Sequence, residues 1–202
     1  MKQLIIASAM ILSVAGTSAM AAPDGTFRQA HEYGYGDKSS LDPASRGRVM
    51  QITEKLMSRL IRPDMKGSPS PDLAISWSAN DSATEWTLKL RSGVSFHDGS
   101  SFEAADVLYT LNRVLDPENK SPARSAIKMI EKMEALDSMT VKFTLSTPFA
   151  DMPLQLMDYR LRIIPEGSGD SIATSGIGTG PFKLVSFDAA GVTKLEANMD
   201  YW

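Results

Sequence analysis

The feature that most constrains this chain is the stretch 71–116, in which a strand pattern is followed at once by a helix pattern. From Trp86 to Leu90 apolar side chains alternate with polar ones, which is the period of a half-buried strand. The segment His97-Asp98-Gly99 then supplies turn residues. Ser100 to Glu103 fits a capping box, and apolar residues recur at helical spacing from Phe102 to Leu115. The stretch therefore predicts strand, turn and helix in that order.

The same patterns predict further elements on either side of this stretch. Alternation predicts strands, and apolar residues three and four apart predict helices. The expected strands are 31–35, 139–145, 182–187 and 192–197, and the expected helices are 45–61, 126–136 and a short one from Pro148 through Met157. Strands and helices are thus expected to be mixed along the chain, and no internal repeat is present.

The first 21 residues have the character of a signal peptide. Lys2 gives a positive start, Leu4 to Val14 form an apolar segment, and Ala19-Met20-Ala21 offers a small-x-small cleavage pattern. The alternative, a membrane-spanning helix, needs about 20 apolar residues, and serine and threonine interrupt the run. The chain has no cysteine and so no lipid attachment site. We expect cleavage and a soluble periplasmic protein.

Composition argues against nucleic-acid binding and against a disordered chain. The formal net charge is −3, and loss of residues 1–21 removes one Lys and no acid, which makes it −4. Nucleic-acid binding requires clustered Lys and Arg, so this mild acidity argues against it. With 43% hydrophobic residues the chain is expected to be globular and not disordered.

The order of residues in the first stretch strongly resembles the signature of the family 5 solute-binding proteins, the dipeptide and oligopeptide receptors of ATP-driven importers. The matching positions are Leu73, Ala74, Trp77, Thr87, Leu90, Arg91, Gly93, Val94, Phe96, His97, Asp98, Gly99, Phe102, Ala104, Asp106 and Val107. A second element, Gly178-Thr179-Gly180-Pro181, resembles the Gly-Thr-Gly-Pro motif of the same family.

The resemblance implies an α/β fold, that of a type II periplasmic binding protein, of which this chain is expected to hold only part of lobe one and to lack the second lobe. By that analogy, 22–64 and 173–202 form the base of the lobe, and 65–172 form an inserted α+β subdomain. Family members are far longer, so the chain is expected to be a truncated receptor that binds ligand weakly or not at all by itself.

The function implied is capture of a solute between two lobes and its delivery to an inner-membrane ABC permease, by a monomer without cofactor or catalysis. Peptides are the leading ligand class. Nickel chelates, haem, glutathione, opines and oligosaccharides are alternatives within the family, and a non-functional remnant is another.

Catalytic and metal-binding motifs are poorly supported. Only His31 and His97 are available, and His97 lies in a turn where a structural role is expected. No Gly-x-Ser-x-Gly elbow is present, so an enzyme on this scaffold is disfavoured. The glycines of 176–180 precede a strand and not a helix, which argues against a phosphate loop. We expect no metal site.

Two segments are candidate ligand contacts. Ser45, Arg46 and Gly47 lie in a loop that borders the ligand cleft in related receptors, and arginines at the start of a helix gain nothing from its dipole. In the second segment, Tyr159 offers an aromatic surface, while Arg160 and Arg162 would share one side of a strand and suit a carboxylate. Solvated arginines at a helix start and a charged edge strand are the alternative interpretations.

Overall fold

The computed structural model describes residues 25–29, 36–189 and 191–202. The predicted signal peptide and the strand predicted at 31–35 lie outside these ranges. In chain order the elements are η1 (Gly36–Lys38), α1 (Met50–Leu56), β1 (Ile61–Pro63), β2 (Pro69–Pro71), β3 (Ala74–Ala79), β4 (Glu85–Leu90), α2 (Ala104–Leu115), η2 (Pro117–Asn119), α3 (Arg124–Ile127), β5 (Ile130–Asp137), β6 (Thr140–Leu145), α4 (Met152–Leu156), η3 (Ser168–Asp170), α5 (Ile172–Ser175), β7 (Phe182–Ser186) and β8 (Lys194–Ala197).

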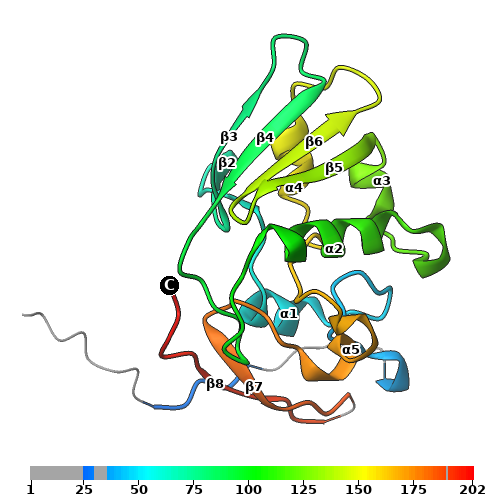
Figure 1. The fold of residues 1–202 in the computed structure, drawn as a ribbon. Helices are drawn as coiled ribbons and strands as arrows, with labels where there is room; N and C mark the ends of the chain where they lie inside the picture. Colours follow the sequence, from blue (N-terminus) through cyan, green and yellow to red (C-terminus); the bar gives the residue numbers. More distant parts are fainter. Residues whose placement is uncertain (1–24, 30–35, 190) are drawn as a thin grey trace, which may run out of the picture.

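A four-stranded antiparallel sheet in the order β3-β4-β6-β5 forms one end of the molecule, and α2 runs beneath it (Figure 1). The alternation of buried and accessible side chains predicted from the sequence is observed in β4, where Trp86, Leu88 and Leu90 are buried and Lys89 is exposed. The strand, turn and helix expected in 71–116 are confirmed, and Gly99 adopts a positive φ of 88° in the turn.

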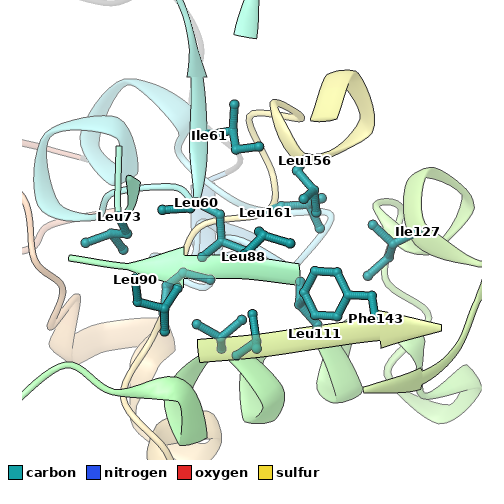
Figure 2. Packing of buried hydrophobic residues seen from close by; sticks show 14 of the residues in the cluster. Leu60, Ile61, Leu73, Leu88, Leu90, Leu111, Ile127, Phe143, Leu156 and Leu161 are labelled. Atoms are coloured by element: carbon teal, nitrogen blue, oxygen red, sulfur yellow. The ribbon is translucent and has the colours of Figure 1, made fainter. Parts of the chain in front are cut away.

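The larger hydrophobic core fills the space between this sheet and its neighbouring segments. Figure 2 shows Leu88 from β4 and Phe143 from β6 in the same cluster as Leu111 from α2. Leu60 and Leu161 enter this cluster from connecting segments. Each of these side chains is almost completely buried, and burial of one such side chain stabilises a fold by roughly 1.5–3 kcal/mol.

A second, smaller core lies at the opposite end, where α1, α5 and the β7–β8 hairpin are found (Figure 1). Its fully buried members are Leu41, Leu56, Met57, Ile164 and Ile172. The hairpin confirms the two strands predicted after 180, and its strands pair antiparallel with Phe182 opposite Ala197. These elements bring the loop before α1 close to the segment around 160–164.

The helix predicted over 45–61 is much shorter in the structure, since α1 covers only Met50–Leu56. After Met57, which is extended, the backbone pairs with another part of the chain: the Leu73 amide donates to the Arg59 carbonyl, and Ala74 donates to Leu60. Tertiary pairing therefore overrides the helical spacing. Among the described residues, no helix is long and apolar enough to cross a bilayer.

The helix predicted over 126–136 is wrong. Residues 124–127 make one helical turn, and 130–137 form strand β5, which pairs with β6 at the edge of the sheet. The apolar residues Ile127, Ile130 and Met133 are three apart, a spacing that suits a helix face. In a short segment, however, pairing with a neighbouring strand determines the secondary structure more strongly than the intrinsic helix preference of the residues does.

The predicted capping box is displaced by three residues. Helix α2 begins at Ala104 with Glu103 as its N-cap, and the carboxylate of Asp106 accepts the Glu103 backbone amide at 2.8 Å. The second oxygen of Asp106 accepts the Glu166 amide, also at 2.8 Å. Ser100 instead binds Asp98 in the preceding turn. The helix predicted from Pro148 is likewise shorter, because α4 begins at Met152.

Candidate functional site

The loop that precedes α1 is held by backbone pairing and presents an exposed arginine. Ser40 pairs with Arg48 in an isolated parallel bridge, and the Ser40 amide donates to the Gly47 carbonyl at 2.8 Å. A Cβ on Gly47 would overlap the Lys38 carbonyl, so the loop requires glycine there. Arg46 is exposed and has no hydrogen-bond or ion-pair partner within the described part of the chain.

Arg48 joins this loop to the second predicted segment. Its Nη2 donates to the hydroxyl of Tyr159 at 2.7 Å, and its Nη1 donates to the Ser45 carbonyl at 2.9 Å. The guanidinium carbon also lies 5.0 Å from the centre of the Tyr159 ring, which is within cation–π distance. We call Ser45–Arg48 together with Tyr159 the Arg48–Tyr159 junction. Two predicted contact segments, more than 100 residues apart in sequence, thus meet.

The two arginines of the second segment lie in different environments. Residues 158–165 form no strand, and within them only Arg162 pairs, with Arg59, in an isolated bridge. Arg160 binds both carboxylate oxygens of Asp158 and donates to the Pro122 carbonyl at 2.6 Å. The hydrogen bonds to Asp158 raise the pKa of Arg160. Its guanidinium carbon lies 5.5 Å from the Tyr159 ring centre, so this ring contacts two cations.

Arg162 is buried, with only 5% of its surface exposed. Its Nη1 donates to the Met57 carbonyl at 2.6 Å, but its Nε is buried without a partner. No carboxylate of the described residues lies within ion-pair distance of it. Burial, and then the nearby charge of Arg59, lower the pKa of Arg162 to about 10, so it remains charged at neutral pH.

This burial without an ion pair, which Glu54 and Asp72 offset only in part, leads to a testable expectation. A buried charge without a counter-ion costs several kcal/mol, so an apolar residue of similar length is tolerated or preferred. We expect Arg162→Met to raise the free energy of unfolding by about 1 kcal/mol, as measured by urea denaturation. Arg160→Met, which leaves the Asp158 carboxylate without its partner, serves as a contrast and is expected to be destabilising. A decrease in the free energy of unfolding above about 2 kcal/mol for Arg162→Met would show that the hydrogen bond to Met57 outweighs the cost of burying the charge.

Sequence reasoning found most of these residues but missed the one that connects them. Arg48 directly follows the predicted Ser45-Arg46-Gly47, in the same segment, but is not among the predicted contact residues. No local signal indicates that it reaches Tyr159, because the contact depends on how distant segments pack. Among the described residues, no group of three or more His, Asp or Glu is placed to hold a metal ion.

The fold agrees with that of a known class of protein, the bacterial extracellular solute-binding proteins. The family described as "Bacterial extracellular solute-binding proteins, family 5 Middle" matches residues 68–202, which is well over half of the chain. The chain therefore belongs to this family.

Particular relatives can be named. The glutathione-binding protein GsiB of Pectobacterium atrosepticum is 37% identical over 134 residues, which cover 64% of this chain and 26% of that protein. The di/tripeptide-binding protein 1 of Pseudomonas aeruginosa is 30% identical over 234 aligned positions, covering 100% of this chain and 43% of that protein. The structure of the PBP AgaA in complex with agropinic acid, from A. tumefacien R10, is 31% identical with a TM-score of 0.75, covering 84% of this chain and 35% of that one.

The chain therefore spans between about a quarter and less than half of the length of these relatives. Its mixed architecture of helices and sheets matches part of a periplasmic binding protein.

Proposed function

We propose that this chain is part of the periplasmic substrate-binding component of an ABC importer. The component captures a small peptide or peptide-like solute and delivers it to an inner-membrane permease. Family membership supports the transport role. The names of two relatives, a glutathione-binding and a di/tripeptide-binding protein, support a short peptide as the solute. No catalytic step is part of the proposal.

The observation that carries the proposal is the Arg48–Tyr159 junction. Arg46 is an exposed cation without a partner among residues 25–29, 36–189 and 191–202, and Tyr159 is 41% exposed beside the guanidinium of Arg48. Neither Arg46 nor Arg48 has a carboxylate within ion-pair distance among the described residues. A peptide carries a carboxylate that a guanidinium can bind with two parallel hydrogen bonds. The junction thus offers positive charge beside an aromatic surface.

The six predicted contact residues take different parts in this proposal. Ser45, Arg46 and Tyr159 contact the solute directly, because their side chains are at least partly accessible. Gly47 allows its backbone to lie close to the Lys38 carbonyl, which shapes the loop. Arg160 helps to position the Tyr159 ring, whose centre lies 5.5 Å from its guanidinium carbon, while it is bound to Asp158. Arg162 lies beneath this segment and reaches solute only if its buried guanidinium becomes accessible.

A second candidate solute is a non-peptide acid. The AgaA structure holds agropinic acid, and it matches this chain over 84% of its residues. Such a ligand also presents a carboxylate to arginine. The choice between the two classes therefore depends on the remaining part of the ligand and not on the charged group that the junction would bind.

The test is calorimetric titration of the complete protein encoded by the gene, with glutathione, trialanine, trialanine amide and agropinic acid as ligands. We expect saturable binding of at least one peptide, weaker binding of the amide, and about tenfold weaker binding for Arg46→Ala. Lys66→Ala, which removes an exposed positive charge from the turn between β1 and β2, should have no effect. Binding of agropinic acid alone would favour the second candidate solute. Equal ligand affinities of Arg46→Ala and Lys66→Ala would exclude Arg46 as a solute contact.

A further inference from the structure

His97 joins two parts of the chain through three hydrogen bonds. Its backbone amide donates to the Gly178 carbonyl at 2.9 Å. In return, the Gly178 amide donates to its Nδ1 at 3.3 Å, and its Nε2 lies 3.0 Å from the Gly180 carbonyl. The turn at 96–99 and the segment 178–180, about 80 residues apart in sequence, are therefore tied together by one residue.

These contacts define the protonation state of the ring. Because Nδ1 accepts a hydrogen bond from an amide, it carries no proton, and Nε2 must therefore carry the one hydrogen of the neutral imidazole. Nε2 then donates to the Gly180 carbonyl. A second proton on Nδ1 would point directly at the N–H of Gly178, so the pair would change from attractive to repulsive.

The segment that His97 contacts is packed closely against the end of α1. A Cβ on Gly178 or Gly180 would overlap the backbone at the end of α1, which shows that the two backbones are already in close contact. The Gly180 amide donates to the Leu56 carbonyl at 2.9 Å. The Gly180 carbonyl also accepts from the side-chain amide of Asn198 at 3.1 Å.

Few charged groups surround the ring. Lys183 on β7 opposes protonation, although it is itself paired with Asp200, and Asp98 in the same turn favours protonation. At this contact α1 contributes the backbone of its last turn and no acid. Burial is the largest influence, and it lowers the pKa of His97 below its ordinary value of 6.5.

We propose that His97 is an acid-sensitive clamp, which holds the 178–180 segment against α1 while its imidazole is neutral and releases it when the ring takes up a second proton. The clamp acts where the turn at 96–99, α1 and the start of the β7–β8 hairpin meet. Its release loosens the hairpin from the remainder of the fold without breaking any covalent bond.

The direction of the pH effect follows from the position of the proton. Above pH 6.5 both the folded and the unfolded chain hold a neutral His97, and the clamp contributes in full. As the pH falls below 6.5, the unfolded chain takes up the proton first, so stability is lost until the folded protein is also protonated. Each unit between the two pKa values makes the unfolding equilibrium constant tenfold larger. Asp72 and Asp106, whose pKa values burial raises, change stability in the opposite direction.

The test compares urea midpoints of the parent chain, His97→Gln and His31→Gln between pH 7.5 and 5. Glutamine can offer both a donor and an acceptor but does not titrate. We expect the parent and His31→Gln to lose stability below pH 6.5, and His97→Gln to lose less. A parallel NMR titration of the parent follows the imidazole signals and does not depend on whether the variants fold. A His97 midpoint at or above 6.5, or an unchanged pH slope in His97→Gln, would overturn the clamp.

Discussion

Arg113→Met is expected to lower the free energy of unfolding by about 3 kcal/mol. In the folded chain, Nη1 and Nη2 of Arg113 bind Oδ1 and Oδ2 of Asp42 at 3.0 and 2.6 Å, a two-pronged pair between α2 and the loop before α1. The side chains are only 17% and 11% exposed. Removal of the cation leaves a buried carboxylate without its partner, which is far more costly than the loss of a surface ion pair.

A second variant separates the charge from the packing. Asp42→Asn combined with Arg113→Met removes both charges and keeps an oxygen that can accept the Ala44 amide, which Asp42 now binds at 2.8 Å. This double variant should recover at least half of the lost stability in urea denaturation. A loss below about 1 kcal/mol for the single variant would mean that the pair is screened like a surface contact.

Gly178→Ala is expected to lower the free energy of unfolding by a similar or larger amount, about 3 kcal/mol or more. The added Cβ would overlap the Leu56 carbonyl oxygen and lie 2.5 Å from Cγ of Met57. Backbone cannot move aside as a flexible side chain does, so either α1 or the 178–180 segment must shift. The shift would also disturb the hydrogen bonds between Gly178 and His97.

Gly93→Ala provides the matched control. Gly93 has a positive φ of 74°, but nothing lies within 4 Å of the position that a Cβ would take. Its substitution therefore costs only the strain of the left-handed backbone, about 1 kcal/mol. Thermal and urea denaturation of both variants would show the difference. Equal losses at Gly178 and Gly93 would contradict the close-contact explanation.

The elements that sequence alone predicted well are those whose pattern and neighbours agree. In β4 the alternation of apolar residues matches one buried face, and α2 has a continuous apolar stripe. The failures occurred where a local pattern allowed two outcomes. Residues 130–137 could form a helix face or an edge strand, and the partner that decides between them, β6, cannot be read from those residues alone.

The candidate site shows the same limit more clearly. Local sequence suggested that Arg160 and Arg162 act alike, since they are two residues apart. In the folded chain one is bound to Asp158 and the other is buried beneath the Met57 carbonyl. Burial, and the meeting of Arg48 with Tyr159, result from long-range packing, for which a single sequence offers no periodic signal.

The central proposal is that a solute carboxylate binds at the Arg48–Tyr159 junction. The most direct measurement is NMR titration of the complete protein with trialanine and with glutathione, following the side-chain signals of Arg46, Arg48 and Tyr159. The account predicts saturable shifts of these signals at the ligand concentration at which calorimetry shows binding. Binding of these ligands or of agropinic acid that leaves all three signals unchanged, or the absence of binding by all three compounds, would contradict it.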